Sequence, residues 1–386
     1  MEDVEKAIAE AAYVVVGSGF YGLTLAERIA TELNQKVVVI EKRNHIGGNA
    51  YSYVDESTGI EIHKYGSHLF HTSNEQIWGY INTFSKFNNY RHFVIAKTGG
   101  VEFEMPINLS TLNAIFGESM NPHQARSRVA LETAKFSHNA LQNLEDFALS
   151  QVGSEIYEKL IKGYTTKQWG KYPSELPREI FQRLPIRYNY NRDYFSDKYM
   201  GLPIDGYYKI FERMVNSQFI KVFLETDYFQ VRDFIKVGKK TIYSGPVDKL
   251  FDFKYGELEW RTLDFEFENL QMEDYQGCAV VNYPDVNVPF TRIHEFKHLH
   301  PERESFGMTS IAREFSRVSE LDDEPYYPIN TSRNSDLYLK YREEVRATNN
   351  LIVGGRLGSY KYLDMHMAIG MALKDFESLK RSGQNE

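Results

Sequence analysis

Three glycines near the start of the chain have the spacing of a nucleotide-binding turn. Gly17, Gly19 and Gly22 form a Gly-x-Gly-x-x-Gly pattern between an apolar run at 13–16 and a segment of helical periodicity. The first glycine permits a tight turn, the second lets a pyrophosphate approach the backbone, and the third lets the helix pack close to the strand. Free N–H groups at the helix start attract the phosphates. The pattern predicts a dinucleotide site; the alternative is a tight turn without a ligand.

The residues after the second apolar run indicate which dinucleotide binds. Glu41 ends that run, where its carboxylate can accept hydrogen bonds from ribose hydroxyls. Gly47 and Gly48 follow within a few residues. This pair resembles the FAD-binding signature of flavoproteins related to glutathione reductase and the amine oxidases, whereas NAD dehydrogenases do not usually carry it. FAD is therefore favoured over NAD, and the sequence has no second glycine fingerprint for a nicotinamide.

A second strand, glycine and helix pattern lies near the other end of the chain. A short apolar run ends at Gly354-Gly355, Arg356 and Tyr362 follow, and a helix is expected from about Met365. A helix start facing the flavin would stabilise negative charge on the reduced ring. Asp364 could bind the ribityl chain or only cap this helix. We interpret the constellation as part of the site, with packing as the alternative.

Composition narrows the class of protein. The formal net charge of −8 disfavours a nucleic-acid or anionic-membrane partner. No apolar run approaches the roughly 20 residues that span a bilayer. The acidic start, MEDVEKAIAEAA, lacks the features of a signal peptide. The single cysteine, Cys278, excludes an intrachain disulfide and fits a reducing compartment, so a cytoplasmic enzyme is expected.

The patterns predict a mixed α/β fold in which a discontinuous Rossmann-like FAD-binding domain carries an inserted helical domain and an antiparallel sheet domain. Residues 75–95 and 127–182 have helical periodicity, 184–206 read as a long loop, and 219–300 alternate like antiparallel strands. The expected boundaries are 1–72, about 220–250 and 340–386 for the FAD domain, about 73–105 and 250–335 for the sheet domain, and about 106–215 for the helical domain with a mobile substrate loop.

Several segments together resemble the UDP-galactopyranose mutase family of the bacterial type. They are GSGFYG, the GGN after Glu41, YGSHLFHT, GYTTKQWG, RLPIRYNYN, YSGPVDKLFDFKYGELEWRTL, TRIHEFKH, EPYYP and GGRLGSYKYLDM. The resemblance runs in order from about residue 13 to about 375. It implies non-covalent FAD that is active when reduced, and interconversion of UDP-galactopyranose and UDP-galactofuranose without net redox change. In the family, the flavin N5 is believed to attack the anomeric carbon and displace UDP.

The resemblance also implies residue roles. Arg187 and Arg292 match the two arginines that bind the diphosphate, and guanidinium groups suit that task because they clamp phosphate bidentately. His68 is the likelier of two histidines to neighbour the flavin, with a structural histidine as the alternative, and neither is assigned as a general acid or base. The expected catalytic residues are thus Arg187, Arg292 and His68.

The predicted sets are larger than these three. The substrate-binding set is Tyr164, Thr165, Trp169, Arg187, Tyr199, Asn282, Arg292, Tyr327, Arg356 and Tyr362. The cofactor-binding set is Gly17, Ser18, Gly19, Phe20, Gly22, Glu41, Lys42, Gly48, Asn49, His68, Leu69, Gly355, Arg356, Tyr362, Asp364 and Met365. Tyrosines suit sugar and uracil because each offers an apolar face and a hydroxyl, although core packing is the alternative for several. No metal site is expected.

Rival functions remain open at this stage. A mutase that also accepts UDP-N-acetylgalactosamine is similar, but His71 holds the position that distinguishes it, which favours the galactose enzyme. An amine-oxidase-like FAD oxidoreductase shares the cofactor fingerprint without explaining the arginines. A non-catalytic FAD or UDP-sugar binding protein is a further alternative. The resemblance also implies a homodimer that supplies galactofuranose for cell-surface polysaccharide.

Overall fold

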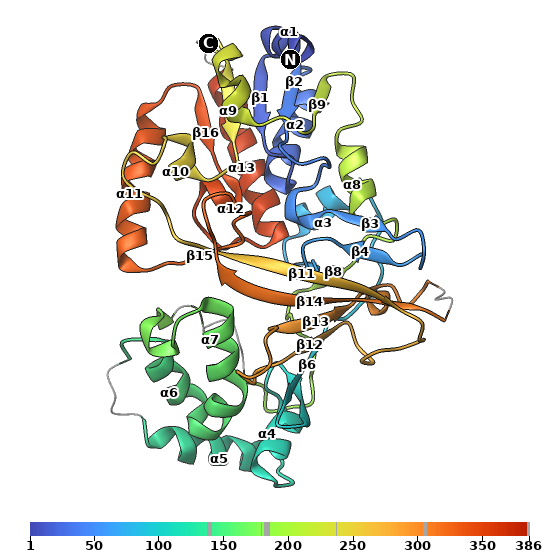
Figure 1. The fold of residues 1–386 in the computed structure, drawn as a ribbon, viewed down its shortest axis with the longest axis vertical. Coiled ribbons are helices and arrows are strands. Elements are labelled where there is room, and N and C mark those ends of the chain that lie inside the picture. Colours follow the sequence, from blue (N-terminus) through green and yellow to red (C-terminus); the bar gives the residue numbers. More distant parts are fainter. Residues whose placement is uncertain (137–140, 179, 181–185, 237, 304–306, 384–386) are drawn as a thin grey trace.

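Two large β-sheets organise the protein, as a computed structural model shows (Figure 1). The structure describes residues 1–136, 141–178, 180, 186–236, 238–303 and 307–383. In Figure 1 the parallel sheet and its helices lie above the long strands β11 (Trp260–Leu270) and β14 (Thr309–Val318), and the helices α4 to α7, within residues 109–169, lie below them. The expected mixed fold with a Rossmann-like unit and a separate, mainly antiparallel sheet is confirmed.

The upper sheet is fully parallel, with strand order β16-β10-β1-β2-β9. Its strands are β1 (Tyr13–Val16), β2 (Val37–Ile40), β9 (Ile220–Phe223), β10 (Lys240–Tyr243) and β16 (Leu351–Val353). Val15 and Val39 pack in the main core cluster with α2 (Phe20–Glu32), whereas Val14 and Val38 pack in a second cluster with α1 (Glu2–Glu10). Because both faces are covered, β1 and β2 need apolar residues at every position, which is how they read in the sequence.

The strand-like segment at 219–300 does not form a single antiparallel sheet. Its first two strands, β9 and β10, join the parallel sheet on either side of β1 and β2. The expectation of antiparallel pairing was wrong there, because alternation within a strand does not specify the strand with which it pairs.

The second sheet has seven strands in the order β15-β11-β14-β13-β12-β6-β7. Every neighbouring pair is antiparallel except β12 with β6. Its strands are β6 (Val94–Thr98), β7 (Val101–Met105), β11 (Trp260–Leu270), β12 (Val280–Asn282), β13 (Arg292–Glu295), β14 (Thr309–Val318) and β15 (Tyr327–Pro328).

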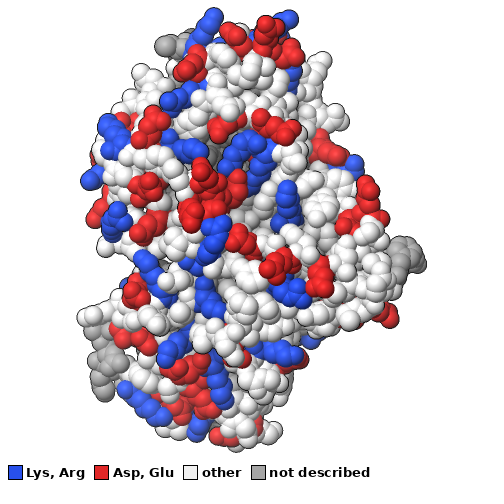
Figure 2. Space-filling model, in the orientation of Figure 1, with Lys and Arg blue, Asp and Glu red and all other residues white. Residues whose placement is uncertain are grey.

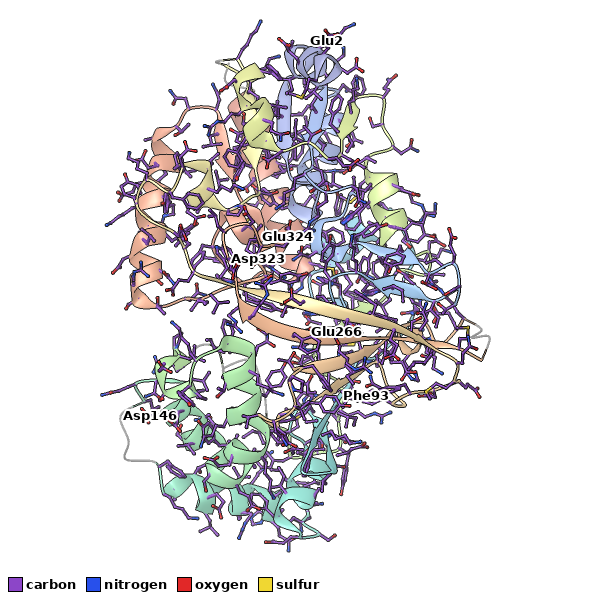
Figure 3. All side chains as sticks on the ribbon, in the orientation of Figure 1. Glu2, Phe93, Asp146, Glu266, Asp323 and Glu324 are labelled. Atoms are coloured by element: carbon purple, nitrogen blue, oxygen red, sulfur yellow. The ribbon has the colours of Figure 1, made fainter. Side chains whose placement is uncertain are left out.

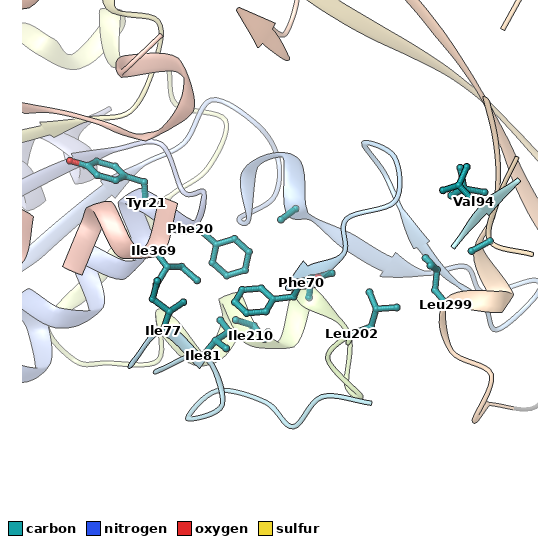
Figure 4. Packing of buried hydrophobic residues seen from close by; sticks show 14 of the residues in the cluster. Phe20, Tyr21, Phe70, Ile77, Ile81, Val94, Leu202, Ile210, Leu299 and Ile369 are labelled. Atoms are coloured by element: carbon teal, nitrogen blue, oxygen red, sulfur yellow. The ribbon is translucent and has the colours of Figure 1, made fainter. Parts of the chain in front are cut away.

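Shorter elements connect the two sheets. Two small ladders pair β3 (Ser52–Val54) with β4 (Glu61–His63), and β5 (Phe70–Thr72) with β8 (Tyr199–Gly201). Phe20, Phe70, Ile77, Ile81, Ile210 and Ile369 pack together between these ladders and the helices (Figure 4). The helices here are α3 (Glu75–Ile81), α8 (Tyr207–Met214) and α13 (Met365–Gly383), with the 3-10 turns η1 (Gly48–Ala50) and η6 (Phe296–Leu299).

The observed helices differ in their bounds from the helices that the sequence periodicity predicted. It contains α4 (Leu109–Phe116), α5 (Pro122–Ala134), α6 (Leu144–Ile156), the π-helix η2 (Tyr157–Lys162), α7 (Gly163–Trp169) and η3 (Pro173–Glu175). The expected helix at 75–95 ends at Ile81, because β6 begins at Val94. Likewise α5 ends at Ala134, and Asn143 starts α6 by accepting a 2.9 Å hydrogen bond from Asp146 N.

The remaining elements are α9 (Tyr228–Val231), η5 (Arg232–Phe234), α10 (Val247–Leu250), α11 (Ser332–Ala347) and α12 (Gly355–Gly358). Of the expected loop at 184–206, residues 184 and 185 lie outside the described residues, and the rest is irregular apart from β8. Among the described helices, none is long and apolar enough to cross a membrane.

Candidate active site

The glycine turn has the geometry that its pattern predicts. Gly17 has a φ of +93°, which favours glycine, and its N–H donates to Ile40 O at 2.8 Å. Gly19 is the N-cap of α2. A Cβ on Gly22 would lie 2.1 Å from Gly17 O, so the helix packs on the turn only because Gly22 has no side chain. The start of α2 is thereby held at the carboxyl end of β1, where ligands bind in open parallel sheets.

A cavity of about 510 Å³ opens in front of this turn, a volume typical of ligand pockets. The expected cofactor residues that line it are Gly17, Ser18, Gly19, Phe20, Glu41, Lys42, Gly48, Asn49, His68, Gly355, Arg356, Asp364 and Met365. The structure does not bring Gly22, Leu69 and Tyr362 to the lining: Gly22 packs on the turn, and Tyr362 stacks on neighbouring side chains. Phe20 directs its ring into the core against Phe211, 4.7 Å away, so its backbone is the part that faces a ligand (Figure 4).

Glu41 is more constrained than its position in the sequence suggested. Its side chain is buried, and Oε2 accepts hydrogen bonds from Ser18 N at 2.9 Å and Ser18 Oγ at 2.7 Å. Oε1 accepts from Arg43 N at 3.0 Å. A carboxylate oxygen accepts about two hydrogen bonds, so the open acceptor is on Oε1.

The donor set of the cavity fits a dinucleotide. Arg43 donates from Nη2 to Asn49 Oδ1 at 2.8 Å and to Glu324 Oε2 at 2.6 Å, while its buried Nη1 has no hydrogen-bond partner among the described residues. A Cβ on Gly48 would lie 3.1 Å from Gly19 Cα, so two glycine backbones meet at the cavity wall. A phosphate or adenine acceptor would satisfy Nη1, and a pyrophosphate would fit against the two backbones.

Sequence reasoning missed one wall of this cavity. The segment 319–325 of the second sheet lines the cavity, and its Glu324 forms ion pairs with Lys42 at 2.7 Å and with Arg43 at 2.6 Å. Figure 3 labels Asp323 and Glu324 just above β11 and β14, and Figure 2 shows acidic and basic side chains side by side in this central area. The basic pair after Glu41 was visible in the sequence, but its distant partner carries no local signal.

The C-terminal constellation forms the opposite end of the cavity. Gly355 has a φ of +73°, and α12 turns the chain so that Arg356 lines the cavity. Arg356 donates to Leu363 O from Nη2 at 2.7 Å and stacks over the Tyr362 ring at 5.1 Å. Asp364 precedes α13, and its carbonyl accepts a helical hydrogen bond from Ala368 N at 3.0 Å. The start of α13 therefore faces the cavity, as expected for a flavin-side helix.

His68 and His71 occupy different surroundings. His68 lines the cavity and its Nδ1 lies 2.7 Å from Gly66 O, so Nδ1 carries the proton and Nε2 is free to accept. Burial lowers the pKa of His68 to about 4, so its ring is neutral near pH 7. His71 stacks on Phe195 with 3.7 Å between the ring centroids, and its Nδ1 lies 2.7 Å from Asp197 Oδ2.

A second cluster of expected residues lies where α7 meets the second sheet. Arg292 donates from Nη2 to the Tyr164 hydroxyl, and its Nε lies 3.1 Å from Glu314 Oε1. Glu314 is buried and also accepts from Thr291 Oγ1 at 3.0 Å, while His294 Nε2 lies 3.1 Å from it. Burial works against the charged forms, but the close contact raises the pKa of Arg292 and lowers the pKa of Glu314. The guanidinium therefore stays charged and paired with Glu314.

Ring contacts join this cluster to the cofactor cavity. Trp169 lies 6.4 Å from Tyr327, and Tyr327 stacks on Tyr362 at 5.7 Å. Tyr362 in turn lies under Arg356, which lines the cavity. Burial raises the pKa of Tyr327 to about 12, so its hydroxyl remains protonated. Four predicted residues, from α7, β15, α12 and the segment after α12, thus form one continuous surface.

Of the other expected substrate residues, some lie near Arg292 and others pack elsewhere. Asn282 pairs with Arg292 in the register of β12 and β13, and its buried Oδ1 has no hydrogen-bond partner among the described residues. Thr165 is buried on α7. Arg187 donates to the carbonyls of Asn191 and Asp193 in its own loop. Tyr199 stacks on Trp78 of α3 at 5.0 Å, and this packing keeps it outside the Arg292 cluster.

Glu314 and His294 are further residues that the sequence did not reveal. Glu314 on β14 lies opposite Arg292 in the register with β13, and His294 lies two residues after Arg292 on β13 itself, but nothing in the spacing of the chain predicts that both meet Glu314. The fold also gathers two groups of possible metal ligands, His71 with Asp364 and His366, and Asp274 with Glu295 and His298. In the first group Asp197, which is not a member, already holds His71 Nδ1, and in the second His298 Nε2 lies 3.3 Å from both Asp274 and Glu295, as in an ordinary ion-pair cluster; we assign no metal to either.

Comparison with known proteins identifies the class. A family model described as UDP-galactopyranose mutase matches residues 159–362, and one described as an NAD(P)-binding Rossmann-like domain matches residues 15–84. The chain is 40% identical to a probable UDP-galactopyranose mutase of Klebsiella pneumoniae, over 97% of this chain and 96% of that protein. It is 38% identical to a dTDP-fucopyranose mutase of Escherichia coli, over 94% and 96%.

A more distant relative and a solved structure agree with these matches. A UDP-galactopyranose mutase of Mycoplasma genitalium is 32% identical, over 95% of this chain and 94% of that protein. The fold matches a crystal structure of reduced UDP-galactopyranose mutase with a TM-score of 0.74 at 16% identity, over 96% and 93% of the two chains. The chain is therefore a nucleotide-sugar mutase of the pyranose–furanose type. It belongs to the UDP-galactopyranose mutase family.

Proposed function

We propose that this mutase interconverts UDP-galactopyranose and UDP-galactofuranose with bound, reduced FAD. The observation that carries the proposal is the continuous surface from Arg356 at the cofactor cavity, through Tyr362, Tyr327 and Trp169, towards Arg292. A nucleotide diphosphate carries two negative charges and needs guanidinium partners, while its sugar and base suit tyrosine faces. The surface offers both kinds of group next to a site for a redox cofactor.

FAD would be held by the glycine turn, by Arg43 and by the starts of α2 and α13. Once bound and reduced, it would supply a nucleophile for the anomeric carbon, and the overall reaction would involve no net redox change. The protein's own part is then electrostatic. Arg292 and Arg187 would neutralise the diphosphate as it leaves and returns, since this leaving group needs charge stabilisation more than a proton. His68, neutral and with an open Nε2 acceptor, would orient a hydroxyl or ring N–H.

The second candidate is a dTDP-fucopyranose mutase, which the relative of that name at 38% identity favours. Fucose lacks the hydroxyl on C6, and dTDP adds a thymine methyl group while it loses a ribose hydroxyl. We place UDP-galactose first because the unpartnered Asn282 Oδ1 suits a sugar rich in hydroxyl groups. A UDP-N-acetylgalactosamine mutase ranks lower, because His71 is bound to Asp197 and stacked on Phe195.

Further properties belong to the same proposal. The enzyme would work in the cytoplasm as a homodimer and would supply galactofuranose for cell-surface polysaccharide. These expectations follow from the family resemblance and from the single buried cysteine.

The test is a substrate panel. Protein reduced with dithionite is incubated separately with UDP-galactofuranose, UDP-N-acetylgalactosamine and dTDP-fucopyranose, and the products are separated by HPLC. We expect the highest kcat/KM for UDP-galactofuranose. A higher value for the dTDP sugar would transfer the assignment to the second candidate, and no conversion of any sugar by reduced, FAD-loaded protein would refute both.

A further inference from the structure

Helix α7 is attached to the second sheet by a lysine that binds only backbone carbonyls. Lys167 Nζ lies 2.5 Å from Tyr283 O, 2.9 Å from Val288 O and 2.9 Å from Phe290 O. These contacts engage all three donors of an ammonium group. The turn that they hold, 283–290, connects β12 to β13, and its ends carry Asn282 and Arg292.

The backbones of helix and turn also touch directly. A Cβ on Gly163, the first residue of α7, would lie 2.3 Å from Pro284 O, so a side chain there would push the helix away. Tyr164 follows Gly163 and accepts the hydrogen bond from Arg292. Lys167 lies one turn further along the same helix and fixes the distance between this helix and the turn.

A second cation holds the end of α7 from the sheet side. Arg261 on β11 is only 2% exposed and donates from Nε to Gln168 O at 3.0 Å and from Nη2 to Ser316 Oγ at 3.0 Å. Within the described residues, neither Lys167 nor Arg261 forms an ion pair with a carboxylate. Burial lowers the pKa of Lys167 to about 8 and the pKa of Arg261 to about 10.

Cations that lose water without forming an ion pair are costly, because desolvation of the half-buried Lys167 and the buried Arg261 is offset mainly by neutral acceptors, and at Lys167 also by the more distant charge of Asp285. A fold that needed only a helix anchor could use an apolar contact at lower cost. Here both cations lie beside residues proposed to bind a diphosphate. Their charge, which no ion pair among the described residues neutralises, adds positive potential where a dianion would bind.

We propose that Lys167 is a positioning residue for the nucleotide-sugar site: it fixes α7 against the turn 283–290, so that Tyr164 on the helix and Arg292 and Asn282 on the strands keep the separation that a sugar diphosphate requires. Lys167 acts through these residues and has no direct part in the reaction. The inference rests on the proposed function, since it assigns a role in binding that substrate.

The test compares Lys167→Met with Lys167→Arg and with a matched control. Lys239→Met is the control, because Lys239 Nζ also donates to backbone carbonyls, those of Ala9 at 2.8 Å and Ala11, but at the parallel sheet. We expect Lys167→Met to raise the KM for UDP-galactofuranose and the Kd of UDP about 10-fold or more, with kcat changed less than about threefold and the FAD content unchanged. Lys167→Arg should recover most of the affinity. Lys239→Met should lower Tm and leave KM unchanged.

The outcomes separate the inference from the proposed function. If Lys167→Met lowers Tm but keeps the wild-type KM and UDP affinity, Lys167 only stabilises the fold and the inference is overturned. Should Lys167→Met fail to fold with FAD, Lys167→Gln, which retains two donors, is judged by the same KM criterion. If the wild-type protein neither binds UDP nor converts UDP-galactofuranose, the proposed function itself fails.

Discussion

The cofactor cavity and the Arg292 cluster are built in opposite ways. At its glycine-rich wall the cavity is formed by backbone, where Gly17 and Gly19 follow β1 and Gly48 approaches Gly19 so closely that a Cβ on it would lie 3.1 Å from Gly19 Cα. The Arg292 cluster is formed by side chains that come from α7, β13, β14 and β15. This wall of the first site depends on the space beside the glycines, whereas the second site depends on a buried ion pair between Arg292 and Glu314.

This difference predicts different weaknesses. A backbone site fails when an added side chain fills the space of the ligand, and such a change can leave the fold intact. A site made of paired charges fails when one partner is removed, because the other remains buried and unpaired. Substitutions in the two regions should therefore separate loss of cofactor from loss of turnover.

The largest effect is expected from Arg292→Ala. The substitution removes the proposed diphosphate ligand and leaves Glu314 buried without its guanidinium partner, so kcat/KM should fall about 100-fold or more while FAD remains bound. HPLC of UDP-galactofuranose conversion and the flavin absorbance of purified protein measure the two properties. Arg313→Ala is the control, because Arg313 forms a partly exposed ion pair with Glu268 at 2.9 Å on the same sheet. Loss of FAD from Arg292→Ala would show that Arg292 serves the cofactor site instead.

The next effect tests the backbone site. Gly19→Ala fits the fold, because φ is −73° and the nearest atom to the new Cβ is Gly48 Cα at 4.0 Å. The methyl group would enter the space of the pyrophosphate, so the Kd of FAD should rise about 10-fold with little change in the Tm of the apoprotein. Fluorescence titration with FAD gives the Kd. An unchanged Kd would place the pyrophosphate elsewhere.

A smaller effect concerns the segment between the two sites. His63 Nδ1 accepts a 3.0 Å hydrogen bond from His68 N, so His63 must be neutral in the folded protein, and burial lowers its pKa to about 3. The unfolded chain takes up this proton near pH 6.5, so His63 should lower the free energy of unfolding by roughly 1 kcal/mol per pH unit as the pH drops from 6.5 towards 3, and His68, with its lowered pKa, adds to the slope down to about pH 4. Urea denaturation between pH 7 and pH 4.5 measures this slope.

His63→Asn should make the slope shallower, because the amide oxygen still accepts from His68 N but does not take up a proton in this range. His123→Asn is the control, since His123 is exposed on α5. If both variants keep the wild-type slope, His63 does not link the stability of this segment to pH.

The smallest effect compares neighbouring cations at the cavity. Lys42 is half exposed and pairs with Glu324, so Lys42→Ala should change the Kd of FAD less than about threefold. Arg43→Ala should weaken FAD binding more, because its buried Nη1 has no partner among the described residues and would meet the ligand. Equal effects of the two substitutions on the Kd would contradict this placement of the cofactor.

The same contrast explains what could be predicted from the sequence. Gly19, Gly22 and Glu41 are close together in the chain, so spacing alone predicted their arrangement. The partnership of Arg43 with Glu324, and that of Arg292 with Glu314, depend on strand pairing that no local pattern encodes. For the same reason the alternation at 219–300 suggested antiparallel pairing for β9 and β10 as well, although the expected boundaries placed about 220–250 in the FAD-binding domain, and no local signal indicated that Tyr199 stacks on Trp78.

The most direct test follows sugar conversion and flavin state in a single anaerobic sample. Protein reduced with dithionite is mixed with a large excess of UDP-galactofuranose, and HPLC and flavin absorbance are recorded together. The account predicts many equivalents of UDP-galactopyranose per flavin while the flavin stays reduced. Oxidation of the flavin in step with sugar conversion, or no conversion with reduced flavin bound, would contradict it.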